Sequence, residues 1–174
     1  IDVGVYFGNS QQCFERLISY EADVGILAGV PADDRVTVQL YSTHKIVVFV
    51  NSDHPFFTRE SICLKDLEGE SVVRREAGST TRVAIEGELH AKGITVSPVL
   101  ELGSREAIWL AVKKGLGLGF VADFAFVSHP NLRAVSICDS QVETKYFLAH
   151  LHERRKSKMI KSFCEIALQV ASDV

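Results

Sequence analysis

Apolar and polar positions in the first part of the chain alternate with two different periods. Residues 1–7 follow a strand-like alternation, and Gly8-Asn9-Ser10 then turn the chain into a predicted helix that Asn9 or Ser10 caps. Residues 24–27 predict another strand, and the run 45–50, continuously apolar after its lysine, is typical of a buried strand. The apolar positions of the predicted helix are Cys13, Phe14, Leu17 and Ile18.

The rest of the chain repeats this order of strands and helices. A short strand over 71–73 is followed by a helix that Gly78-Ser79-Thr80-Thr81 opens, and Ser104 caps a second helix. Further strands are expected at 96–102, 117–122, 132–137 and 144–151. A C-terminal helix follows Ser157, with its apolar positions at Ile160, Phe163, Cys164, Ala167, Leu168 and Ala171. The alternation predicts an α/β fold of mixed, mostly parallel sheets with helices on both faces, arranged as two lobes joined by paired strands.

Composition and charge narrow the function classes. The chain has 174 residues, of which 47% are apolar and 24% charged, so it reads as globular rather than disordered. The net charge is −3, whereas domains that bind nucleic acids usually carry a net positive charge. The charge therefore argues against nucleic-acid binding by this sequence itself. The longest apolar runs fall short of the roughly 18 residues that a membrane span needs.

The four cysteines show no spacing typical of a metal site. Cys13 and Cys164 occupy apolar positions of predicted helices, and Cys63 and Cys138 lie far apart in the sequence. Neither a CxxC motif nor a finger-like Cys–His spacing is present. We therefore expect reduced, structural cysteines, no bound metal and no cofactor.

The motifs of common enzyme classes are also missing. Gly115, Gly117 and Gly119 lie between a predicted helix and a following strand, which reverses the order that a dinucleotide-binding loop needs. These glycines are better explained by a tight helix-to-strand connection. Glu86 and Glu88 project to different sides of their helix and do not form an acid/base pair. The sequence thus contains no catalytic constellation, and we expect no enzyme activity.

With metal and catalytic motifs missing, the remaining candidates for a binding site are the polar residues at predicted helix starts. They occur at Gly8-Asn9-Ser10, Gly78-Ser79-Thr80-Thr81 and Gly103-Ser104, where side-chain oxygens lie beside unpaired backbone N–H groups. Such an end favours a small anion, although each side chain can equally cap its own helix. The second start has three consecutive hydroxyls followed by Arg82, which is more than capping requires. We take the Ser79 loop as the best single site candidate.

Several segments, in this order, resemble the effector-binding domain of LysR-type transcriptional regulators. Gly8-Asn9-Ser10 with its helix and the segment 21–27 match the family's early part. The strand 45–50 with Asp53-His54-Pro55-Phe56 is similar to the family's strand and turn. The other matching segments are 75–82, 104–108 and 112–121, the last with a Gly-Leu-Gly-Leu-Gly core.

The resemblance implies a two-lobed fold of the periplasmic-binding-protein type 2 class around a small-molecule cleft. Residues 1–45 and 151–174 would form lobe I, and residues 46–150 would form lobe II. Effector contacts carried over from the family, residue by residue, would be Asn9, Ser10, Ala28, Gly29, Gly78, Ser79, Thr80 and Lys114.

The resemblance also implies partners and a location. Family members carry an N-terminal winged helix-turn-helix that binds DNA, which this sequence does not contain, and Ile1 aligns with the family's second strand. We therefore expect an N-terminally incomplete lobe I, DNA contact only through the absent domain, and no membrane. Domains of this family pair as homodimers or tetramers in the cytoplasm.

These observations predict the ligand-sensing domain of a LysR-type regulator, with a preference for an anionic effector. A solute-binding protein of a transport system shares the fold and would need an export signal. An enzyme on the same scaffold would need an acid/base set, and a pure dimerisation module would need no ligand at all.

Overall fold

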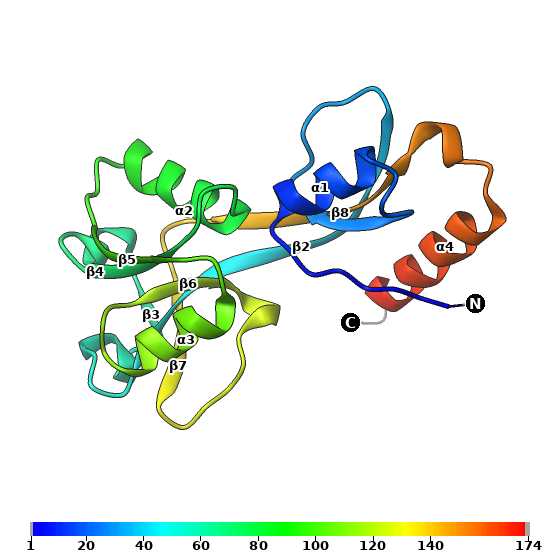
Figure 1. Cartoon of the computed structure of the whole chain (residues 1–174). Helices are drawn as coiled ribbons and strands as arrows, with labels where there is room; N and C mark the ends of the chain where they lie inside the picture. The colour runs from blue at the N-terminus through cyan, green and yellow to red at the C-terminus, as the bar shows by residue number, and fades with distance from the viewer. Residues whose placement is uncertain (1, 173–174) are drawn as a thin grey trace. The chain divides into compact units, whose positions relative to one another are not determined.

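The computed structural model describes residues 2–172, which divide into two compact units (Figure 1). Unit 1 comprises Ile1–Thr43 and Lys145–Val174, and unit 2 comprises His44–Thr144. Each boundary falls inside a long strand, β2 (Val36–Asn51) or β8 (Glu143–Leu151). Within the described residues no helix is long and apolar enough to cross a membrane.

Unit 1 is built around the packing of helix α1 (Ser10–Ile18) on strand β1 (Gly25–Ala28). The amphipathic spacing expected for this helix is confirmed, since Phe14 and Leu17 are buried against Leu27 and Ala149. Strand β1 pairs antiparallel with β8, with Gly25 opposite Ala149. The cluster that α1 forms with β1 and β8 is therefore small and uses one face of that helix.

The strand expected over residues 1–7 is wrong for the part that is described. Residues 2–9 form neither helix nor strand, and Phe7 is 88% exposed. An alternating segment becomes a strand only when a neighbouring strand accepts its backbone hydrogen bonds, and none is paired with it in the described chain. Residue 1 lies outside the described residues.

The C-terminal helix α4 (Lys158–Ser172) has the predicted phase. Ile160 is buried, and the half-buried positions that follow it are Cys164, Ala167, Leu168 and Ala171. Phe163, by contrast, is 45% exposed. The backbone N–H of Ile160 approaches the hydroxyl of Ser157 at 3.5 Å, at the position expected for the cap.

Unit 2 is organised by the second half of β2. This half pairs antiparallel with β6 (Gly119–Ala122) and with β7 (Leu132–Ile137), and β3 (Ser61–Ile62) pairs parallel with β7. The parallel pair β4 (Ser71–Arg75) and β5 (Ser97–Leu102) forms a separate ribbon. The sheets are thus mixed, but the expected predominance of parallel pairing is not found, because β6 and β7 both run opposite to β2.

The two faces of β2 belong to different hydrophobic clusters. Ile46, Val48 and Val50 pack in one cluster, and Val47 and Phe49 pack in the other. Successive side chains of a strand point to opposite faces, so a strand covered on both sides must be apolar at every position. This explains the unbroken apolar run that the sequence showed over 46–50.

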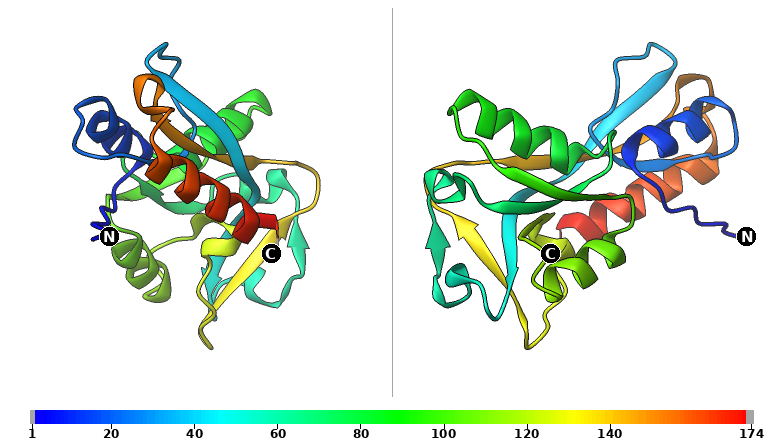
Figure 2. Two further views of the ribbon diagram at one scale, coloured as in Figure 1. Left: turned by 90° about the vertical axis from the view of Figure 1, so that its right-hand side faces the viewer. Right: turned by 60° about the vertical axis from the view of Figure 1, so that its left-hand side comes forward.

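Helices α2 (Thr80–Ala91) and α3 (Arg105–Lys113) cover opposite sides of the β4–β5 ribbon (Figure 2). Ile85 of α2 packs in the cluster that contains Val72, whereas Ile108 of α3 packs in the cluster that contains Val73. Because Val72 and Val73 are neighbours in β4, their side chains face opposite ways. Each face of the ribbon is therefore covered by one of the two helices.

The glycine run is a tight connection between α3 and β6, as expected. The backbone at Gly117 has φ +155°, and a Cβ there would lie 2.7 Å from the carbonyl oxygen of Ser71. At Gly119 a Cβ would lie 2.4 Å from the Phe49 ring, which stacks on Trp109 with centroids 4.9 Å apart. Both positions need glycine because backbone or a packed ring occupies the space of a side chain.

The connection supplies a test of this packing. We expect Gly117→Ala to lower the free energy of unfolding by about 2 kcal/mol or more, because the new methyl meets a backbone carbonyl that cannot rotate away. The matched control is Gly87→Ala in helix α2, where a Cβ meets nothing within 4 Å. That variant should be about 0.5–1 kcal/mol more stable than the original chain. Urea unfolding measures both, and equal stability of the two variants would contradict the packing described.

Candidate functional site

The start of α2 in unit 2 combines buried hydroxyls with an N-cap residue whose side chain does not cap the helix. Ser79 is the N-cap residue and is 4% exposed, yet its side chain makes no capping hydrogen bond. Gly78 before it has φ +88°, a conformation that favours glycine and lets the chain turn sharply from the loop into the helix. The first N–H groups of an α-helix have no acceptors in the preceding turn, and here the ladder begins with the Val83 N–H, which donates to the Ser79 carbonyl at 3.0 Å. This end can therefore hold an anion.

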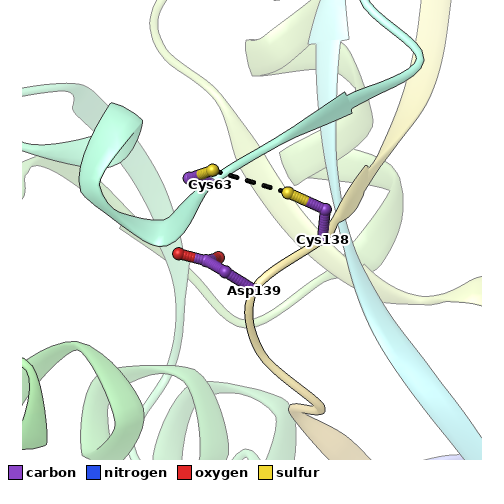
Figure 3. Close-up of side chains that lie close together, drawn as sticks. All are labelled: Cys63, Cys138 and Asp139. Carbon is purple, nitrogen blue, oxygen red and sulfur yellow. Dashed lines mark hydrogen bonds between the residues drawn. The ribbon is translucent and has the colours of Figure 1, made fainter.

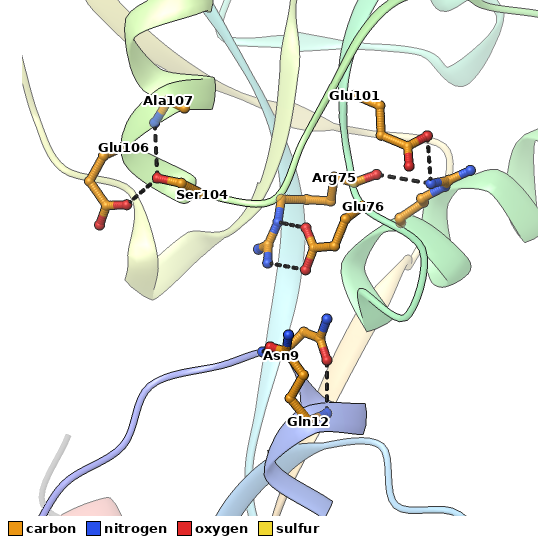
Figure 4. A network of polar contacts seen from close by, with 9 residues as sticks. Asn9, Gln12, Arg75, Glu76, Glu101, Ser104, Glu106 and Ala107 are labelled. Carbon is orange, nitrogen blue, oxygen red and sulfur yellow. Dashed lines mark hydrogen bonds and ion pairs between the residues drawn. The ribbon is translucent and has the colours of Figure 1, made fainter. Parts of the chain in front are cut away.

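The other two polar helix starts serve their own helices. Ser104 accepts a hydrogen bond from the Ala107 N–H at 3.3 Å and donates one to the Glu106 carboxylate at 2.6 Å. The latter bond lowers the pKa of Glu106 below its ordinary value. In unit 1, Asn9 and Gln12 form a reciprocal capping box with both bonds at 3.0 Å (Figure 4). Capping thus accounts for the hydroxyl and amide at these two starts.

The loop before α2 is held by arginines. Arg75 forms a two-pronged ion pair with Glu76, with both N–O distances at 2.9 Å (Figure 4). Arg82, in the first turn of α2, donates to the Arg75 carbonyl at 3.0 Å. It also pairs with Glu86 and Glu101 at 3.0 and 3.1 Å. These ion pairs and hydrogen bonds of Arg75 and Arg82 hold the loop in place, and the Ser79 side chain takes no part in them.

A groove runs along α2 where it faces the β4–β5 ribbon. Its lining is mainly apolar, with Thr81 and Arg82 near the helix start and Leu89 near the helix end. Glu86 also lines the groove and is held by Arg82, whereas Glu88 accepts a hydrogen bond from Ser140 at 2.9 Å. Glu86 and Glu88 therefore have separate hydrogen-bond partners.

The remaining predicted site residues are distributed over both units. In unit 1, Asn9 and Ser10 begin α1, while Ala28 ends β1 and Gly29 follows it with φ +72°. Because the chain turns back from α1 into β1, these two pairs lie at the same end of that helix–strand unit.

Lys114 lies apart from the start of α2. It is the exposed C-cap residue of α3, just before the segment in which Leu118 bridges Val72 near the beginning of β4. Ser79 follows the end of β4 instead, so the two residues are at opposite ends of this strand. The unit 2 candidates thus reduce to Gly78, Ser79 and Thr80 as one group, with Lys114 separate.

A cluster of two thiols and a carboxylate was not expected from the sequence. The sulfur atoms of Cys63 and Cys138 lie 3.4 Å apart, and Asp139 adjoins them (Figure 3). The contact with Cys138 raises the pKa of the Cys63 thiol above its ordinary value. The long stretch of sequence between the cysteines hid the pair, because only the pairing of β3 with β7 brings them together.

Comparison with known proteins assigns the family. The family model of the LysR substrate binding domain matches residues 1–172. The chain is 30% identical to the HTH-type transcriptional activator CmpR of a Synechocystis strain over 70% of this chain and 40% of that protein. It spans about half the length of the curated relatives it matches.

Two solved structures share the fold over nearly the whole chain. The CcmR regulatory domain of Synechocystis PCC6803, in complex with 2-PG, has a TM-score of 0.83 and 26% identity, covering 94% of this chain and 80% of that one. The QuiR effector binding domain, in complex with shikimate, has a TM-score of 0.86 and 20% identity, covering 95% of this chain and 79% of that one. The likeness confirms the periplasmic-binding-protein-like fold class. The chain belongs to the LysR substrate-binding domain family and is an effector-binding, ligand-sensing domain of that type.

Proposed function

We propose that this chain binds a small anionic effector at the start of α2 and thereby regulates a DNA-binding transcription factor. The observation that carries the anion assignment is the buried N-cap residue Ser79, whose side chain does not cap the first-turn N–H groups beside it. Both the free donors and the positive end of the helix dipole favour a carboxylate, phosphate or sulfate.

The ligands of related structures agree with this chemistry. The CcmR domain was solved with 2-PG and the QuiR domain with shikimate, which carries a carboxylate. We take 2-PG as the first compound to test because CcmR is the more similar of these two structures in sequence. On this proposal Ser79 and Thr80 hold the anionic group, and Asn9, Ser10, Ala28, Gly29, Gly78 and Lys114 remain predicted effector contacts.

Regulation would follow from differential binding. A ligand that binds one conformational or assembly state more tightly than another shifts the population toward it. We propose that the chain acts within a homodimer or tetramer in the cytoplasm, and that DNA is bound by a helix-turn-helix domain like that of the HTH-type relatives, outside this sequence. Transport and enzymatic roles are not favoured, because the curated relatives are named as transcriptional regulators.

The first prediction concerns affinity. Ser79→Ala and Thr80→Ala should each weaken binding of 2-PG by about tenfold, as expected for one lost hydrogen bond to a charged group. Titration calorimetry on the whole chain measures this. The matched control is Ser104→Ala, which removes a hydroxyl from another helix start and should leave the affinity unchanged.

The assignment of the site to Ser79 is wrong if 2-PG binds the original chain and the Ser79→Ala variant with equal affinity. If 2-PG does not bind the original chain, the choice of this compound is wrong, and shikimate and inorganic phosphate are the next anions for the same comparison. An anion preference is wrong if only uncharged compounds raise the melting temperature.

The second prediction concerns the free energy of unfolding, which distinguishes a side chain that caps a helix from one that is available to a ligand. Ser104→Ala should lower the free energy of unfolding by about 1 kcal/mol, because the Ala107 N–H loses its acceptor. Ser79→Ala should change it by less than about 0.5 kcal/mol, since that hydroxyl makes no capping bond. Urea unfolding without ligand gives both values. A larger loss for Ser79→Ala than for Ser104→Ala would show that Ser79 has a structural role instead.

A further inference from the structure

Cys63 and Cys138 are held side by side by backbone pairing. Strands β3 and β7 run parallel, with Ile62 opposite Ile137, and each cysteine is the first residue after its strand. The Cys138 N–H donates to the Ile62 carbonyl at 2.9 Å, which extends the ladder to the cysteines themselves. Their proximity is therefore a property of the fold rather than of two flexible side chains.

A carboxylate completes a group of three donors. One ligand atom from each of Cys63, Cys138 and Asp139 lies within 4.8 Å of the others. Asp139 is oriented by the Leu64 N–H, which donates to its Oδ1 at 2.8 Å, and the Cys63 N–H donates to Asp66 at 2.9 Å. The backbone around the cluster is thus anchored at two points, while the three donor side chains are exposed and open to solvent (Figure 3).

The distance between the sulfurs suits a shared metal ion. Two thiolates about 2.3 Å from a tetrahedrally coordinated zinc ion lie roughly 3.8 Å apart. The observed 3.4 Å needs only a few tenths of an ångström of opening. A disulfide, by contrast, needs the two sulfurs about 2.05 Å apart, so the distance between them would have to shrink by more than an ångström.

The donor types select a class of metal. Thiolates prefer soft or borderline ions such as Zn²⁺, whereas Mg²⁺ and Ca²⁺ prefer sites made only of oxygen. We propose that Cys63, Cys138 and Asp139 form a surface site for a thiophilic divalent metal ion of the zinc class, with water as the fourth ligand. The site is distinct from the start of α2 and does not depend on the effector proposal.

Cobalt(II) and zinc(II) titrations of the whole chain under a thiol-free reductant test this site. Co²⁺ should give a thiolate charge-transfer band and the visible bands of tetrahedral cobalt at one ion per chain, and Zn²⁺ should displace it. Cys63→Ser and Cys138→Ser should each weaken zinc binding by about 100-fold, and Asp139→Asn by about tenfold. Circular dichroism checks that the variants keep their fold, which is expected because all three residues are exposed.

The half-buried cysteines of α1 and α4 provide the matched control. Cys13→Ser and Cys164→Ser remove a thiol elsewhere and should leave the cobalt spectrum and the zinc affinity unchanged. The proposal is overturned if zinc binds the Cys63→Ser variant as tightly as the original chain, or if no charge-transfer band forms. It is equally overturned if the reduced chain binds no metal and Cys63 and Cys138 only join as a disulfide when an oxidised small thiol is added.

Discussion

The burial of β2 on both of its faces is the constraint on which unit 2 depends. Val48 and Val50 are completely buried on one side, and Phe49 is buried on the other. Full burial removes each side chain from water at about 25 cal/mol per Å² of apolar surface, and it leaves the strand's backbone no alternative to pairing with β6 and β7. The strand thus separates two cores and sets the positions of the helices on either side.

The buried strand β2 also determines where the start of α2 lies. Residue Val73 of β4 hydrogen-bonds through its N–H to the Leu118 carbonyl at 2.9 Å, just before β6, which itself pairs with β2. The end of β4 is thereby fixed relative to the buried strand, and Gly78 turns the chain into the helix at that point. The arginine contacts then hold the loop, so the Ser79 hydroxyl is placed without taking part in capping.

Local features of the fold could be predicted from the sequence, and features that need a distant partner could not. Asn9 and Ser104 can be predicted as helix starts because a cap and its helix are neighbours in sequence. The alternation at the start of the chain predicts a strand that residues 2–7 do not form, and the pattern does not predict the first part of β2, because strand formation depends on which segment lies alongside. The candidate site shows the same limit. The hydroxyls at 79–81 can be read from the sequence, but whether the Ser79 side chain caps α2 depends on how that side chain is oriented in the folded protein.

The same reasoning explains why the sequence indicates an anion and not a cation. The unpaired backbone N–H groups at a helix start belong to one short segment, so a polar helix start can be predicted from that segment alone. A cation site needs several charged or soft donors on one spot, and their mutual repulsion has to be offset by rigid placement. Cys63 and Cys138 meet this condition because two paired strands hold them, and a pairing of segments so distant in the chain leaves no trace in spacing. The two sites proposed for unit 2 therefore differ in origin, since one is encoded in a short segment and the other in the topology.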